Sequence, residues 1–310
     1  MFLLAGALGW LFVGRVLSGL SAGIFTGTAT ATIVDLAPDH GKARASLIAA
    51  GVNMGGLGAG PLLAGILAQY APLPLQRVLH RRSGASCGGR PWRPSRCGTR
   101  CDGPARRTCG HRRSTVPIEI RGVFTRAAIA GFAGFAVLGL FTAVSPAFLA
   151  TVLHETNHAL TGAVVISVFI ASTIGQSLSS TISEQRALIV GCVGLIAGMI
   201  LVGASLPIRS LAVLIAGGVI AGLGQGLSFR AGLGAVTGAA PPDKRGEITS
   251  SYFVMLYVGI AIPVIGEGAA AQAFGLIASG IVFAALVGIL AAIAVLLLVR
   301  KGSSQPRDHR

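Results

Sequence analysis

The stretch "IAGLGQGLSFRAGLGAVTGAAPPDKR", residues 220–245, decides the fold, because it joins a glycine-rich apolar run to a charged turn. A second stretch, "LSGLSAGIFTGTATATIVDLAPDHGKAR" at residues 17–44, has the same order of features. At an offset of 203 residues the two stretches pair Gly19 with Gly222, Gly23 with Gly226, and Ala37-Pro38 with Ala240-Pro241. We therefore expect the chain to hold two related groups of helices.

The composition is that of an integral membrane protein. Of the 310 residues, 53% are hydrophobic and 11% charged, and the mean hydropathy is +0.75. A soluble chain of this length cannot bury so much apolar surface in one core. The 45 glycines fit the same class, because helices in lipid associate through small residues that let their backbones approach closely.

The apolar runs long enough to cross a bilayer predict an all-α, polytopic membrane protein. The predicted spans are residues 11–34, 46–70, 127–152, 163–183, 187–206, 211–237, 248–271 and 276–299. The loops at 183–186 and 241–247 and the C-terminal tail 301–310 each contain Lys or Arg, whereas the opposite loops contain one cation in total, Arg209. This asymmetry places the tail in the cytoplasm.

An internal repeat of helix groups is typical of secondary transporters, which hold a substrate cavity between two halves. The stretch "GRVLSGLSAG" (14–23) resembles the fourth-helix signature of the major facilitator superfamily, with its Arg at Arg15. The stretch "GGLGAGPLLAG" (55–65) resembles that family's fifth-helix motif of antiporters. The motif matches at Gly56, Gly60, Pro61 and Gly65, and it departs at Ala64.

The resemblance, which covers about 270 residues, implies a twelve-helix fold of two six-helix halves, present here as helices 4, 5 and 7 to 12. Helices 1 to 3 are expected to be missing from the N-terminus, so the chain is interpreted as truncated. We expect residues 1–71 to be a remnant of the N-terminal half and residues 121–300 to form the C-terminal half.

Residues 72–120 stand where helix 6 and the central loop belong. Within them, residues 76–115 contain eleven arginines, one acid, four cysteines, and no Ile, Phe, Met, Tyr or Lys. This composition indicates GC-rich codons read out of frame, so we interpret the segment as a frame change that begins near residues 74–76 and ends near Val116. High charge without apolar periodicity predicts disorder.

Several other function classes are disfavoured. Nucleic-acid binding rests only on the basic segment, since residues 76–115 carry +10 of the net charge of +15 and the other residues carry only +5. The four cysteines of the segment lack the paired hooks of zinc sites, and no phosphate-binding G-x4-G-K-[ST] motif occurs. Polar groups within the spans are expected to be isolated, which disfavours an intramembrane enzyme. We expect no cofactor and no metal.

The predicted function is transport of a small organic solute across a bacterial plasma (inner) membrane, with the lipid bilayer, the solute and protons as partners. The resemblance implies proton-coupled efflux for the intact relative. Because eleven arginines cannot cross lipid, this chain is interpreted as a fragment that does not transport. The alternative is a non-transporting interaction or regulatory protein built on the six-helix C-terminal half.

Charged groups inside spans are the candidate coupling residues: Arg15, Asp35, Arg230 and Glu267. Arg15 and Arg230 have snorkelling to the membrane surface as the alternative. The glycines and proline of the 55–65 motif act in gating or in plain helix packing. The cytoplasmic loop charges either lock the two halves or are simply solvated; they are Asp39, Lys42 and Arg44, with the repeat partners Asp243, Lys244 and Arg245.

Overall fold

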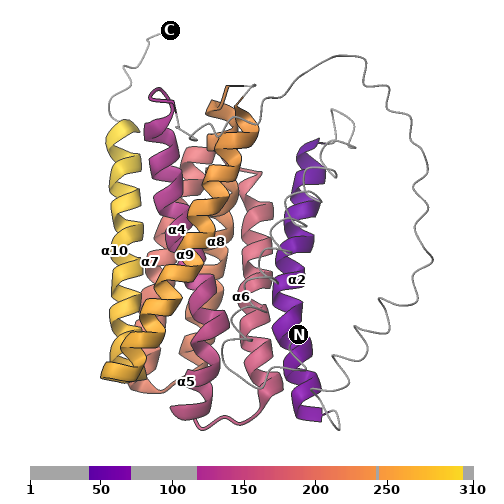
Figure 1. The fold of residues 1–310 in the computed structure, drawn as a ribbon, viewed down its shortest axis with the longest axis vertical. Coiled ribbons are helices and arrows are strands. Elements are labelled where there is room, and N and C mark those ends of the chain that lie inside the picture. Colours follow the sequence, from indigo (N-terminus) through magenta and orange to yellow (C-terminus); the bar gives the residue numbers. More distant parts are fainter. Residues whose placement is uncertain (1–41, 71–116, 242–243, 303–310) are drawn as a thin grey trace, which may run out of the picture.

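The computed structural model describes residues 42–70, 117–241 and 244–302, and these residues are predominantly helical (Figure 1). The helices are α2 (Lys42–Tyr70), α4 (Arg121–Ala143), α5 (Ser145–Thr151), α6 (His158–Ser179), α7 (Glu184–Ile208), α8 (Leu211–Ala239), α9 (Arg245–Phe274) and α10 (Leu276–Gly302). Six of them, α4 and α6 to α10, are long and apolar enough to cross a membrane. The prediction of an all-α polytopic protein is confirmed for these described ranges.

The predicted spans agree with these helices in most places. The span 46–70 lies inside α2, and the last four predicted spans lie inside α7 to α10. The span 163–183 is shifted, because α6 begins earlier and ends at Ser179. Its start is set by the side chain of Asn157, which accepts hydrogen bonds from the backbone N–H groups of Ala159 and Leu160. The span 11–34 lies outside the described residues.

The span 127–152 was wrong as a single helix, because the structure divides it into α4 and α5 at Val144. Pro146 explains the break. Its ring has no N–H to donate to the carbonyl of Thr142, and it disfavours helical geometry at Ser145. The sequence contained this signal, but the apolar run continues through the proline.

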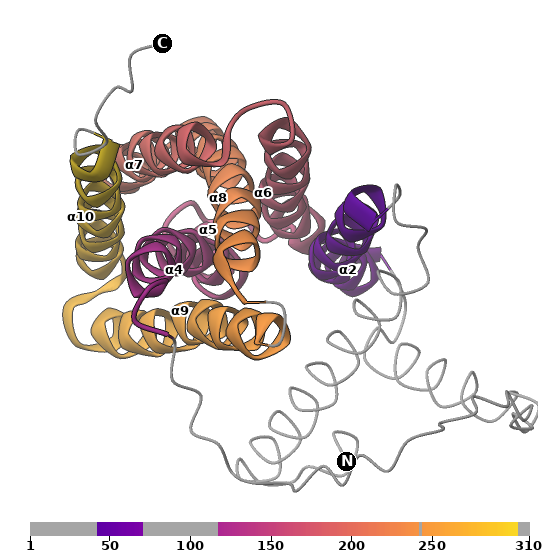
Figure 2. The same cartoon turned by 90° about the horizontal axis from the view of Figure 1, so that it is seen from above.

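Helix α8 packs against α6, α7 and α4, which surround it in the view from above (Figure 2). Glycines set these contacts. A Cβ on Gly222 would lie 2.5 Å from the carbonyl oxygen of Val168 in α6, and one on Gly224 would lie 2.5 Å from that of Gly191 in α7. Helices can approach this closely only where one of them has no side chain. The glycine-rich repeat thus determines how tightly the bundle closes.

The two ends of the undescribed stretch 71–116 lie at opposite ends of the bundle. Helix α2 runs antiparallel to α6, because Gln69 accepts a hydrogen bond from the backbone N–H of His158 (3.0 Å) while Gly58 lies against Phe169. The α4 carboxyl end leads through α5 to the start of α6, so Arg121 is at the far end from Tyr70 (Figure 1). In a bilayer spanned by a bundle so arranged, Tyr70 and Pro117 would therefore lie on opposite faces.

Candidate functional site

A hydrogen-bonded polar cluster is buried between α6 and α8. The Ser172 hydroxyl donates to Gln225 Oε1 at 2.5 Å, and Gln176 Nε2 donates to the Ser172 oxygen at 3.3 Å. Ser172 and Gln225 are fully buried, and Gln176 is 2% exposed. Buried polar groups in lipid-spanning helices need such partners, because hydrocarbon offers none. The cluster joins two helices of an otherwise apolar core.

This cluster corrects the expectation that polar groups within the spans are isolated. The cluster is not marked by charge in the sequence, because Ser172, Gln176 and Gln225 are neutral. A usable signal was present: Gln176 and Gln225 are amide side chains well inside apolar runs. The bond between Ser172 and Gln225 could not be predicted, because these residues lie 53 positions apart on different helices.

Two further hydrogen-bonding groups of the core have no partner within the described residues. They are Gln225 Nε2 and the Tyr252 hydroxyl, and both are buried. Each lies against a glycine of α4: the Tyr252 oxygen is 2.8 Å from a Cβ built on Gly131, and Gln225 Cγ is 2.9 Å from one built on Gly134. The α4 glycines thus leave room for polar side chains from α8 and α9.

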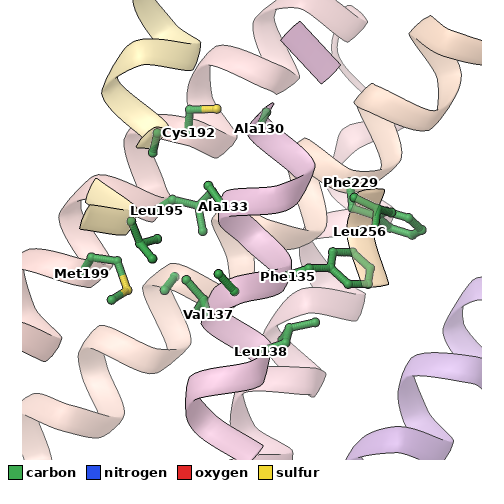
Figure 3. Packing of buried hydrophobic residues seen from close by; sticks show 14 of the residues in the cluster. Ala130, Ala133, Phe135, Val137, Leu138, Cys192, Leu195, Met199, Phe229 and Leu256 are labelled. Atoms are coloured by element: carbon green, nitrogen blue, oxygen red, sulfur yellow. The ribbon is translucent and has the colours of Figure 1, made fainter. Parts of the chain in front are cut away.

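Aromatic side chains adjoin these groups. Phe135 and Phe229 have ring centroids 5.4 Å apart, and Phe253 lies 6.1 Å from Phe229 and 6.4 Å from Tyr252. Figure 3 shows Phe135 and Phe229 pointing toward one another on one side of α4, while Ala133 and Val137 lie near Leu195 and Met199 on the other. The polar groups therefore border an aromatic wall.

Replacing Ser172 by alanine tests whether the cluster stabilises the bundle. The substitution leaves Gln225 Oε1 without its donor, so we expect Ser172→Ala to lower the free energy of unfolding by about 1–2 kcal/mol. Ser167→Ala is the matched control, since its hydroxyl bonds only the Val164 carbonyl of its own helix, and we expect a change below about 0.5 kcal/mol. Unfolding by SDS in mixed micelles measures both, and equal effects would contradict the pairing.

Glu267, a predicted coupling residue, is buried on α9, with 4% of its surface exposed. Its carboxylate lies beside Ser279 of α10, whose hydroxyl donates to the carbonyl of Leu276 at 3.3 Å, and Oε1 has no partner within the described residues. That oxygen is 3.9 Å from a Cβ built on Gly280. Gly280 and Leu206 also line a cavity of about 20 Å³ between α4, α5, α7, α8 and α10, room for about one water molecule.

Arg230, the other candidate that the structure describes, lies half-buried on α8 next to Phe229. Glu267 faces α10 and α7, whereas the polar cluster lies between α6 and α8. The structure thus does not place Glu267, a predicted coupling residue, near the polar cluster of Ser172, Gln176 and Gln225. The other two coupling candidates, Arg15 and Asp35, lie outside the described residues.

The 55–65 motif lies on α2, and only some of its glycines contact α6. A Cβ on Gly65 would overlap the carbonyl of His158, and the Pro61 carbonyl would lie 2.8 Å from a Cβ on Gly162. Gly56 and Gly60 meet no described residue, and Gly58 is the glycine that lies against Phe169. Close approach to α6 therefore uses Gly58 and Gly65 rather than the pair four residues apart.

The predicted loop charges lie at helix starts or outside the described ranges. Lys42 and Arg44 fall in the first turn of α2, Lys244 is the N-cap of α9, and Arg245 is its first residue. Asp39 and Asp243 lie outside the described residues. In the described ranges, no three His, Cys, Asp or Glu side chains gather as metal ligands would.

Comparison with known proteins adds one finding. A family model described as Major Facilitator Superfamily matches residues 127–310. No curated protein matches the chain. The matched range begins within α4 and includes α5 to α10.

Proposed function

Since the chain belongs to the major facilitator superfamily, a family of membrane transporters rather than enzymes, we propose that its fold serves proton-coupled export of a small organic solute. The observation that carries the proposal is the set of hydrogen-bonding side chains buried within apolar helices. Three of their polar atoms are left unpaired among the described residues: Gln225 Nε2, the Tyr252 hydroxyl and Glu267 Oε1. The unpaired groups cost free energy in lipid and gain no hydrogen bond among the described residues, so they fit a solute path.

The proposal gives the charged candidates distinct roles. Glu267 carries the coupling proton, supported by its buried carboxylate, which has one oxygen unpaired within the described residues. Arg15, Asp35 and Arg230 assist the coupling as charges in or at the spans. Gly56, Gly60, Pro61 and Gly65 form a gating motif on α2, and the loop charges from Asp39 to Arg44 and from Asp243 to Arg245 latch the cytoplasmic ends.

We further propose that the chain as written does not transport. Residues 71–116 must join opposite membrane faces, yet their eleven arginines oppose insertion by at least about 2.5 kcal/mol each near the bilayer centre. A frame change across residues 76–115 accounts for this composition. It divides the chain into an N-terminal remnant (residues 1–71), an aberrant segment (72–120), the six-helix C-terminal half (121–300) and a cytoplasmic tail (301–310).

A second candidate function follows if the arginine-rich segment cannot cross the membrane. A chain that cannot place both of its helix groups with consistent sidedness can still insert α4 to α10, which contact one another extensively. Its function would then be to bind a membrane partner without moving solute. Both candidates place the protein in a bacterial plasma membrane.

A chimaera tests the transport proposal. We expect no proton-driven flux from the full chain in vesicles, and flux of a drug-like solute when residues 117–310 follow the N-terminal half of a proton-coupled antiporter of the family. In that chimaera Glu267→Gln should lower flux at least about tenfold, a typical lower limit for a lost proton carrier. Ser210→Ala, which removes only the weak cap of α8, is the control and should leave flux nearly unchanged.

Two results would contradict the transport proposal. A folded chimaera that binds solute without moving it favours the interaction protein. Flux from the unaltered chain would show that residues 71–116 do not block assembly.

A further inference from the structure

The two unpaired core groups have the same hydrogen-bonding need. Gln225 is held through its Oε1 by the Ser172 hydroxyl, so its amide nitrogen presents N–H donors elsewhere. Tyr252 presents a hydroxyl, fully buried, from α9. Both atoms lack a partner among the described residues. A group that satisfies both donors must offer a hydrogen-bond acceptor.

Glycines on two helices make room for the side chains that carry these donors. The Tyr252 oxygen lies 2.5 Å from a Cβ built on Gly232 of α8 and 2.8 Å from one on Gly131 of α4. The Gln225 side chain lies against Gly134, one turn along α4 from Gly131. Any other residue at these glycines would displace the donors. The two donors therefore lie along the same side of α4, where that helix meets α8 and α9.

The surroundings select the kind of acceptor. Gly131 and Gly232 lie against the Tyr252 hydroxyl, and Gly134 lies against the Gln225 side chain. Phe124 of α4 and Cys192 of α7 are also near Tyr252, and none of these neighbours carries a charged group. The adjoining wall consists of Phe135, Phe229 and Phe253. A neutral carbonyl beside aromatic rings fits this environment, because an anion would be stripped of water without a cation to replace it.

We propose that Gln225 and Tyr252 bind the carbonyl oxygen of a neutral aromatic solute, whose rings pack on Phe135, Phe229 and Phe253. This inference rests on the proposed transport function and deepens it by naming the substrate class. The donors are enclosed in this structure, so the solute reaches them when α4 separates from α8 and α9. Ser172 and Gln176 are positioning residues, which hold the Gln225 amide by its oxygen.

Benzophenone is a direct probe, because it is an aromatic ketone that inserts into nearby C–H bonds on irradiation. The purified full chain in maltoside micelles is irradiated with benzophenone, and the labelled peptides are identified by mass spectrometry. We expect labels on the peptides that contain Phe135, Phe229 and Phe253. Benzanilide, which has a carbonyl, should compete, and diphenylmethane, which has the rings alone, should not.

The variants separate recognition from stability. Tyr252→Phe and Gln225→Leu should each lower labelling about threefold or more, and together about tenfold, as expected for lost hydrogen bonds. Tyr257→Phe on the lipid-exposed part of α9 and Gln185→Leu at the start of α7 are the controls, and labelling should not change. Because Tyr252→Phe removes a buried group that has no partner in the described core, its melting temperature should not fall.

The outcomes are decisive in both directions. Labelling that falls in Tyr252→Phe while the melting temperature holds supports the site. Equal competition by diphenylmethane and benzanilide, or labelling unaffected by both substitutions, would overturn it. Since labelling needs no flux, the site can be established even if the chimaera proves inactive, and a transporting chimaera with unlabelled Phe135, Phe229 and Phe253 would refute the site alone.

Discussion

Gly226→Val is expected to separate α6 from α8 and destabilise the bundle, whereas Gly288→Val is expected to leave the bundle intact. A Cβ on Gly226 would overlap the carbonyl of Ser172 and would lie 2.8 Å from the carbonyl carbon of that residue. These atoms belong to the α6 backbone, so no side chain can rotate away and the helix itself must shift. Overpacking of this kind costs about 3 kcal/mol or more.

Gly288 is the matched control for this substitution. It lies inside α10, and a Cβ there meets nothing within 4 Å. Both changes put the same β-branched side chain in a helix interior, so their intrinsic helix propensities cancel. SDS unfolding and thermal aggregation in detergent measure the difference. Similar losses for both variants would show that α6 and α8 are not in this close contact.

The sequence predicted the residues of this contact better than it predicted the polar cluster. Gly222 and Gly226 were picked out by the internal repeat, and the structure places both against the α6 backbone. A glycine stripe predicts a close helix neighbour without naming it, because small residues act through the backbone. The partner of Gln225 depends on which helix lies opposite, and that is a tertiary property.

The 55–65 motif on α2 shows that resemblance to a family pattern does not identify which glycines contact a neighbouring helix. Gly56 and Gly60 match the family pattern, yet the glycines that meet α6 are Gly58 and Gly65. Helical periodicity alone gives two possible glycine faces on this helix, and the choice between them depends on neighbours. Pro146 shows the reverse case, since the local signal for a helix break was readable and the continuous hydropathy concealed it.

The second large effect concerns the faces of the membrane on which Tyr70 and Ile118 lie. In a background without the native cysteines, we expect Tyr70→Cys and Ile118→Cys to react with an impermeant maleimide on the same face of the membrane. Both positions are exposed, at 69% and 73%, and the structure places them at opposite ends of the bundle. Insertion of eleven arginines would cost on the order of 30 kcal/mol, so the intervening segment should remain on one side.

Replacing residues 76–115 by a twenty-residue Leu/Ala helix should reverse this result, because a helix of that length spans the hydrocarbon and needs no charge in it. The two cysteines should then label on opposite faces, as the antiparallel packing of α2 on α6 requires. A neutral Gly/Ser linker of the original length is the control. It should keep both cysteines on one face, because without a spanning helix the linker cannot satisfy its backbone hydrogen bonds in lipid. Labelling on opposite faces in the unaltered chain would contradict the prediction that the arginine-rich segment stays on one side. It would mean that this segment crosses the bilayer and that α2 and the α4–α10 bundle assemble as the structure places them.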